Sequence, residues 1–250
     1  MPNPWDAGSA RLLASLGFEA MATTSSGFAG TLGRLDGGVT REEAIGHAAL
    51  VAAATDLPVS ADLENGFGDD PADVARTVRM AAESGLAGCS IEDFSRRDHE
   101  PIYPVELAAE RIAAAAQAAH DGPSRLVLTA RAENHLHGRD DLADTIRRLQ
   151  AYQDAGADVL FAPGVTAIGG IRRVVASVDR PINVLLLPGM PAIAELEAAG
   201  VRRVSTGGGL AYVAMGAMVG AVRHLLETGT MDAWPLAGAG SKAAHSAFRR

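Results

Sequence analysis

The chain has 250 residues, a formal net charge of −8 and a sequence pI near 5.3, so it can form one sizeable core. The acidic balance and the lack of a Lys/Arg run argue against nucleic acid as a partner. One cysteine, Cys89, excludes an internal disulfide, no export signal is evident, and the apolar run Leu210 to Val222 is too short to span a bilayer. We therefore expect a cytoplasmic protein with no membrane partner.

Apolar runs of strand length alternate with alanine-rich helical patterns along almost the whole chain. The candidate strands are Glu19 to Thr24, Pro58 to Asp62, Gly88 to Glu92, Leu126 to Arg131, Asp158 to Ala162, Ile182 to Leu187 and Arg202 to Thr206. The candidate helices are Ser9 to Leu16, Arg41 to Ala54, Ala72 to Ser84, Val105 to Ala119, Asp140 to Ala155, Ile168 to Ser177, Ala192 to Ala199 and Leu210 to Glu227. Strands that are buried on both faces and joined by helices indicate a parallel sheet.

Seven strands and eight helices are one strand short of an α/β barrel of the (β/α)8 TIM type. The missing strand should precede the first helix, where only Met1 to Pro4 remain, so either the start site is assigned late or a truncated first strand is present. The rival is an open doubly wound sheet, but no G-x-G-x-x-G turn follows an early strand. We predict one barrel domain over residues 1–230 and a tail over residues 231–250, loosely ordered from Trp234 to Arg250.

Two acids stand at the end of the second strand, where Asp62 and Glu64 are followed by Gly66 and Gly68. Their i, i+2 spacing puts both side chains on one side of an extended chain. Oxygen ligands that point the same way suit a hard divalent ion such as Mg²⁺. A solvated turn is the alternative interpretation, because Asp and Gly are also common turn residues.

The other strand ends should meet these acids at the mouth of a barrel, where barrel enzymes carry their chemistry. They deliver Ser26 and Gly27, Glu92 and Asp93, Arg131 and Glu133, Asn183, and Thr206. Converging acids repel one another unless a cation lies among them, which favours a metal. Arg131 could then bind a substrate carboxylate with two hydrogen bonds, and a plain ion pair with Glu133 is the alternative.

Six motifs in order resemble the isocitrate lyase/phosphoenolpyruvate mutase superfamily between about residues 3 and 215. They are Pro4-Trp5-Asp6-Ala7-Gly8-Ser9-Ala10, Ser26-Gly27-Phe28, Asp62-Leu63-Glu64-Asn65-Gly66-Phe67-Gly68, Ile91-Glu92-Asp93, Ala130-Arg131-Ala132-Glu133 and Ala155-Gly156-Ala157-Asp158. The resemblance implies a (β/α)8 barrel, a C-terminal helix swapped between subunits, and a homo-oligomer (a dimer or tetramer). It also implies Mg²⁺, with Mn²⁺ as the alternative ion, and small 2-oxo or 2-hydroxy carboxylates as substrates.

The resemblance also implies roles for individual residues. Asp62 matches the acid that contacts the metal, and Glu64 and Glu92 match acids that hold its waters. Asp36 matches a further acid of that outer set. Arg131 matches the substrate-binding arginine, and Ser26 and Gly27 match the carboxylate cradle. The predicted sites are therefore catalytic Arg131, Glu92 and Asp36; substrate-binding Ser26, Gly27, Phe28, Arg131 and Asn183; and metal-binding Asp62, Glu64 and Glu92.

The loop from Phe94 to Pro101 departs from the family pattern. The lyases carry a Lys-Cys-Gly-His stretch there with cysteine as general acid, and this loop has no cysteine. The phosphonopyruvate-handling members carry a lysine directly after the Glu-Asp pair, where this chain has Phe94. Arg96, Arg97 and His99 are candidate lid residues, and His135 or His137 could supply a proton, although a solvated loop would contain the same residue types.

The remaining groups favour a reaction that needs no strong acid. A divalent ion and Arg131 could bind a 2-oxo acid and stabilise an enolate formed by retro-aldol cleavage or decarboxylation. The sequence therefore predicts a Mg²⁺-dependent carbon–carbon lyase. The alternatives are a phosphonopyruvate-type P–C mutase or hydrolase, and a non-catalytic carboxylate-binding paralogue.

Overall fold

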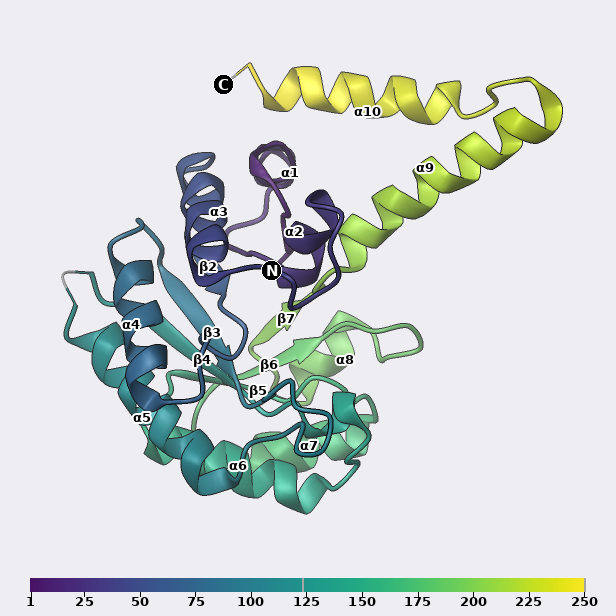
Figure 1. Ribbon diagram of the computed structural model, residues 1–250. Helices are drawn as coiled ribbons and strands as arrows, with labels where there is room; N and C mark the ends of the chain where they lie inside the picture. Colours follow the sequence, from purple (N-terminus) through teal and green to yellow (C-terminus); the bar gives the residue numbers. More distant parts are fainter. Residues whose placement is uncertain (123, 250) are drawn as a thin grey trace.

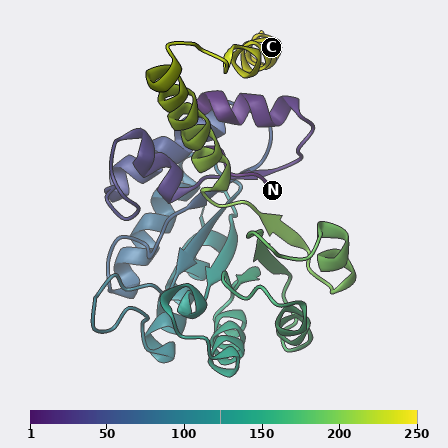
Figure 2. The same ribbon diagram turned by 90° about the vertical axis from the view of Figure 1, so that its right-hand side faces the viewer.

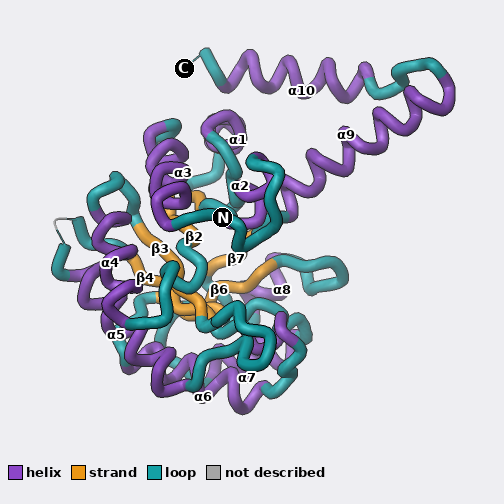
Figure 3. The backbone as a smooth tube through the Cα atoms, viewed as in Figure 1, coloured by secondary structure: helices purple, strands orange, loops and turns teal. Residues whose placement is uncertain are grey.

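A computed structural model describes residues 1–122 and 124–249, and its centre is a seven-stranded parallel sheet. The strands are β1 Met21–Ala22, β2 Val59–Asp62, β3 Gly88–Glu92, β4 Val127–Arg131, β5 Val159–Phe161, β6 Ile182–Leu185 and β7 Arg203–Ser205. They pair in sequence order and curl into a nearly closed barrel with helices outside it (Figures 1 and 3). The predicted α/β barrel fold and the positions of all seven strands are confirmed.

The gap between β1 and β7 holds the first three residues, at the place predicted for the truncated strand. Ala22 N donates to Pro2 O at 3.1 Å, and Met1 N donates to Val204 O at 2.7 Å. The Asn3 side chain donates to Thr23 O on one edge and accepts from the backbone N–H groups of residues 206 and 207 on the other. This segment therefore connects both edges of the sheet, although the described residues form no regular strand there.

The helices follow the predicted alternation closely. Their bounds are α1 Ala7–Ser15, α2 Ser25–Thr31, α3 Arg41–Ala53, α4 Pro71–Ala82, α5 Val105–His120, α6 Leu142–Asp154, α7 Ile168–Ala176, α8 Ile193–Ala198, α9 Gly209–Thr228 and α10 Trp234–Ala247, with a 3₁₀ turn at Asn134–His137. Side-chain caps define where several of the helices begin. Asp6 and Thr40, for example, form capping boxes with the third residue of α1 and α3.

Two short elements lie where the sequence predicted only loops. Thr24 caps α2 by accepting from Gly27 N at 3.3 Å, so the chain enters a helix directly after β1. The 3₁₀ turn Asn134–His137 follows β4 and ends at Gly138, whose φ is 72°. Both elements are too short to give a readable helical period.

The prediction of a loosely ordered C-terminal tail is wrong, because α10 is a regular helix over Trp234–Ala247. Its composition is rich in alanine, a strong helix former, and Pro235 lies in the first turn, where proline fits a helix. Figures 1 and 2 show α9 running away from the barrel and α10 returning over α1. Ala247 is buried at that contact.

Alternation along the strands separates two environments. Ala61, Ile91, Leu128, Ala130 and Leu160 face the helices and join the main hydrophobic core. Their neighbours in the sequence point into the barrel and carry the polar groups described next. Because successive strand residues face opposite sides, one set of strands supplies both the core and the site.

Candidate functional site

A cavity of about 210 Å³ lies inside the barrel and opens at the carboxyl ends of the strands. Its mouth is lined by Ser26, Asp36, Asp62, Arg131 and Gly208, and its wall continues down the barrel interior. Asp62 ends β2 and Arg131 ends β4, so each strand positions its last side chain at the same edge. This is the position at which barrel enzymes of this architecture carry their active sites.

Arg131 is the centre of the charge cluster. Its guanidinium lies 3.2 Å from Asp62 Oδ1, 3.2 Å from Glu92 Oε2 and 2.7 Å from Glu133 Oε1. Glu92 and Arg131 are paired directly across β3 and β4, which explains their approach. The ion pair with Glu133 named in the alternative interpretation is present, both of its side chains are largely buried, and the substrate role of Arg131 stays a prediction.

Burial dominates the electrostatics of the two glutamates beside Arg131. It raises the pKa of Glu92 well above its ordinary value and also raises the pKa of Glu133. One guanidinium therefore faces more carboxylates than it can neutralise. A further cation would relieve this repulsion, which is the electrostatic condition for a metal site.

Glu64 does not contact Arg131 in this structure. It pairs with Arg96 from the loop after β3, and its Oε1 atom is buried with no hydrogen-bond partner among the described residues. Burial raises the pKa of Glu64 to about 7. Both Glu64 and Arg96 have positive φ angles, of 52° and 64°, a strained conformation for residues with a Cβ.

Asp36 lies on the loop between α2 and α3 and lines the mouth of the cavity. Its carboxylate is one of the charges that raise the pKa of Glu64. Gly37, with φ of 82°, passes so close to the Arg96 guanidinium that a Cβ would collide with it. The loop that carries Asp36 and Gly37 therefore packs against Arg96, which pairs with Glu64.

The predicted carboxylate cradle is only partly at the cavity. Ser26 lines it, and Ser25 N donates to Asp62 Oδ2 at 3.3 Å. The Gly27 N–H is used by the Thr24 cap, and the Phe28 ring stacks on His47 with centroids 3.9 Å apart, outside the cavity lining. Phe28 therefore has a packing contact here, and its substrate role stays a prediction.

Asn183 of β6 is buried on the cavity wall, deeper than the mouth. Its Nδ2 donates to Ser205 Oγ at 3.0 Å, and its Oδ1 accepts from Arg203 Nε at 2.9 Å. The sequence placed Asn183 among the substrate-binding residues but did not indicate Arg203 beside it.

The candidate lid loop is attached to the barrel at three points. Phe94 stacks on His137 at 3.7 Å, Arg96 pairs with Glu64, and Arg97 pairs with Asp69. His137 Nε2 lies 3.9 Å from Glu133 Oε2, and burial lowers the His137 pKa. The histidine is therefore favoured in its neutral form.

Sequence reasoning missed the support beneath this cluster. Asp93 is buried and accepts hydrogen bonds from Glu133 N at 2.8 Å, Tyr152 OH at 2.5 Å and Arg148 Nη1 at 3.1 Å. The network connects the ends of β3 and β4 to α6. The periodic pattern of α6 contained no signal for it, because Arg148 and Tyr152 fit an ordinary helix.

The acids do not form a ready metal cage. Within residues 1–122 and 124–249, no three His, Cys, Asp or Glu side chains converge closely enough to bind one ion directly. This arrangement suits an ion with one direct carboxylate ligand and further acids that act through water. Mg²⁺ is commonly bound in this way.

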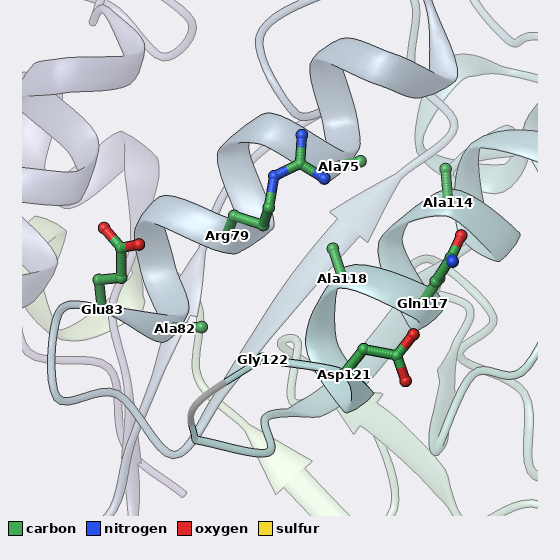
Figure 4. Close-up of a pocket in the computed structure, with 9 residues that line it drawn as sticks. All are labelled: Ala75, Arg79, Ala82, Glu83, Ala114, Gln117, Ala118, Asp121 and Gly122. Carbon is green, nitrogen blue, oxygen red and sulfur yellow. The ribbon is translucent and has the colours of Figure 1, made fainter.

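A second cavity, of about 410 Å³, lies on the outer surface between α4 and α5 (Figure 4). Alanines 75, 82, 114 and 118 form much of its lining, together with Arg79, Glu83, Gln117 and Asp121. It lies outside the barrel and away from the strand ends. Asp62 and Arg131 line the interior cavity, whereas Glu64 and Arg96 line a separate surface cavity of about 410 Å³.

Known structures resemble this arrangement over most of the chain. A Burkholderia cenocepacia J2315 protein, provisionally named a lyase/mutase, is 54% identical with a TM-score of 0.90, covering 92% of this chain and 84% of that one. A 2,3-dimethylmalate lyase is 30% identical with a TM-score of 0.83, covering 92% and 83%.

Sequence comparison agrees with the structural likeness. The 2-methylisocitrate lyase of Salmonella typhimurium strain LT2 is 33% identical over 171 residues, which are 65% of this chain and 57% of that enzyme. The chain spans about half the length of the first curated relatives it matches. Residues 1–226 match the phosphoenolpyruvate phosphomutase family. The chain therefore belongs to the isocitrate lyase/phosphoenolpyruvate mutase superfamily.

Proposed function

We propose that this chain is a Mg²⁺-dependent lyase that cleaves a carbon–carbon bond of a small 2-oxo or 2-hydroxy carboxylic acid through an enolate. The observation that carries the proposal is the convergence of Asp62 and Arg131 on one interior cavity, with Glu92 and Glu133 buried behind them. Relatives in the same superfamily include 2-methylisocitrate and 2,3-dimethylmalate lyases.

The acids fit a single divalent ion. Asp62 would bind it directly, while Glu64, Glu92 and Asp36 would hold its waters. The unpartnered Oε1 atom of Glu64 supports this arrangement, because a buried carboxylate oxygen needs a hydrogen-bond donor such as a metal-bound water. Bound Mg²⁺, or Mn²⁺ in its place, would supply positive charge beside the developing enolate oxygen.

The protein's own groups would bind and orient the substrate. Arg131 would bind its carboxylate, and the contacts with Glu92 and Glu133 hold the guanidinium in one orientation before the substrate arrives. The loop from Phe94 to Pro101 contains no cysteine, which favours release of a stabilised enolate over protonation of a basic carbanion.

Turnover of a substrate panel tests the proposal. With Mg²⁺ or Mn²⁺ present, we expect the purified protein to release pyruvate or glyoxylate from at least one acid in a set including oxaloacetate, 2-methylisocitrate and 2,3-dimethylmalate. Coupled reduction of the product reports the rate, and EDTA should stop it. If no acid in a broad panel of 2-oxo and 2-hydroxy acids yields either product, the lyase proposal fails.

The second candidate function is P–C bond chemistry on phosphonopyruvate. The match to the phosphoenolpyruvate phosphomutase family favours it, and the absence of a lysine after Asp93 counts against it. Phosphorus NMR of phosphonopyruvate incubated with protein and Mg²⁺ separates the two functions. Saturable carboxylate binding without turnover of either substrate class would instead identify a non-catalytic paralogue.

We also propose that the active form is a homo-oligomer in which α9 packs on a neighbouring copy. Only Ala211 of α9 is buried, while Tyr212, Val213, Met218 and Leu226 are exposed. The sequence predicted a run too short to span a bilayer, whereas the whole 20-residue helix is long and apolar enough to cross one, a property that core helices of soluble proteins share. The return of α10 to its own α1 favours a protein partner for α9, and the absence of a membrane partner and the cytoplasmic location stay predictions.

Light scattering after size exclusion should show a dimer or tetramer for the native chain. Met218→Glu places a charge on the exposed apolar face of α9 and should shift the mass toward the monomer. Glu227→Gln, on the same helix, is the matched control and should leave the mass unchanged. A native chain that runs as a monomer, or that partitions into liposomes, would contradict the proposal.

A further inference from the structure

The interior of this barrel is polar, whereas barrels of this type are normally filled by bulky branched apolar side chains. Below Asp62 and Arg131, the cavity wall combines apolar residues such as Phe161 and Leu185 with small hydroxyl and amide side chains and one arginine. The polar residues are Ser60, Ser90, Thr129, Asn183, Ser205 and Arg203. An interior lined in this way is suited to a polar ligand.

Arg203 lies in this wall near the α-ammonium of Met1, and the hydrogen-bond partners of Arg203 are neutral. Its Nε donates to Asn183 Oδ1 at 2.9 Å and its Nη2 to Thr129 Oγ1 at 2.8 Å. In the part of the chain that the structure describes, no Asp or Glu forms an ion pair with it. Burial lowers the Arg203 pKa to about 10, still far above neutral pH, so the side chain keeps its charge. Arg203 is half-buried, so its charge is partly removed from water, and an anion that joined it would be stabilised there.

Arg203 and Arg131 lie at two different depths in the cavity, with Arg131 at the mouth. Thr129, which holds Arg203, stands two residues before Arg131 on β4, and both side chains face the interior. At about 3.3 Å per residue, their backbone positions differ by roughly 7 Å along the strand. The cavity of about 210 Å³ has room for about seven waters at ~30 Å³ each, which restricts a ligand to a small molecule.

We propose that Arg203, held by Thr129 and Asn183, forms an anion subsite inside the barrel that binds the second carboxylate of a small dicarboxylate whose first carboxylate lies on Arg131. The inference rests on the proposed function for the role of Arg131 and narrows the substrate class to dicarboxylates. In this subsite, Asn183 orients Arg203 through the hydrogen bond between them.

Calorimetry with two ligands of equal chain length tests the subsite in Mg²⁺ buffer. Succinate carries two carboxylates and butyrate one, so the native chain should bind succinate about 10- to 100-fold more tightly. Arg203→Met should remove most of that preference and leave butyrate affinity unchanged. Its melting temperature should not fall greatly, because the change removes a half-buried charge that has no acidic partner among the described residues.

Two further variants complete the test. Arg202→Met, at the exposed neighbouring position, should behave like the native chain. Arg203→Lys keeps the charge but not the planar fork, and should recover part of the preference. Equal affinity of the native chain for both ligands, or an unchanged preference in Arg203→Met, would overturn the subsite.

The outcomes separate this inference from the proposed function. If Arg203 is required for succinate binding but no acid is turned over, the subsite stands and the lyase proposal fails. If Arg203→Met turns over an acid with the same KM as the native chain, the lyase proposal stands and the subsite fails.

Discussion

Replacing Asp62 with Asn should weaken Mg²⁺ binding by at least about 100-fold and reduce lyase turnover by about 1,000-fold. The substitution keeps the shape of the side chain, but its single oxygen can accept from only one of the two backbone donors, Ser25 N at Oδ2 or Glu64 N at Oδ1. It removes the carboxylate charge at the proposed point of direct metal contact. Mn²⁺ binding followed by electron paramagnetic resonance measures the affinity without depending on catalysis.

The control for Asp62→Asn is Asp154→Asn, an exposed position at the end of α6. That variant should bind Mn²⁺ and turn over substrate like the native chain. Native-like Mn²⁺ affinity in Asp62→Asn would show that the metal lies elsewhere or is not used. A loss of turnover with intact metal binding would instead assign Asp62 to holding Arg131, which it contacts at 3.2 Å.

Replacing Arg148 with Met should destabilise the fold by about 3–5 kcal/mol at pH 8. The change leaves the buried Asp93 carboxylate without its cation and removes the hydrogen bond from Arg148 Nη1 to Tyr103 O. The midpoint of urea unfolding measures the loss. The geometry of the site should also be disturbed. Asp93 accepts a hydrogen bond from the backbone N–H of Glu133, and Glu133 forms an ion pair with Arg131.

The cost of Arg148→Met should depend on pH in a defined direction. Burial already raises the pKa of Asp93 above its ordinary value of 3.8, and removing the guanidinium should raise it further. A carboxyl whose folded pKa is raised loses stability as pH rises, so the difference from the native chain should shrink as the pH falls toward about 4. Combining the change with Asp93→Asn should recover part of the loss at pH 8.

Arg147→Met is the matched control for this prediction. Arg147 is the next residue of α6, but its side chain is 67% exposed and pairs only with Asp144 at the surface. Exposed pairs of this kind contribute less than about 1 kcal/mol. Equal destabilisation by the two variants would contradict the view that the buried network supports the strand ends.

Most of the barrel could be predicted because its strands are short apolar runs between helices with clear periods. The seven strands found by pattern all pair in sequence order, since consecutive strands joined by helical crossovers lie side by side. The sequence did not reveal α2, whose seven residues begin at the Thr24 cap, or the regular helix α10. Composition favoured a tail there, and only packing on α1 defines α10 as part of the fold.

The candidate site could be predicted in its members but not in its pairings. The i, i+2 spacing places Asp62 and Glu64 together, yet the structure separates them, with Asp62 facing Arg131 and Glu64 facing Arg96. Glu64 has a positive φ, and a backbone angle at one residue leaves no periodic signal in the sequence. Arg96 reaches it from a loop that sequence reasoning treated as lid or solvated coil.

The sequence by itself determined the alternation of strands and helices, the acids and arginine at the strand ends, and the family resemblance. These depend on local pattern and on residue type, both of which can be read along the chain. Only the tertiary structure decided that Arg131 pairs with three carboxylates, that Asp93 is held by Arg148 and Tyr152, and that Arg203 lies below the mouth beside Thr129 and Asn183. Those contacts join strands and helices far apart in the sequence, and their partners are fixed by the closure of the barrel rather than by any local preference.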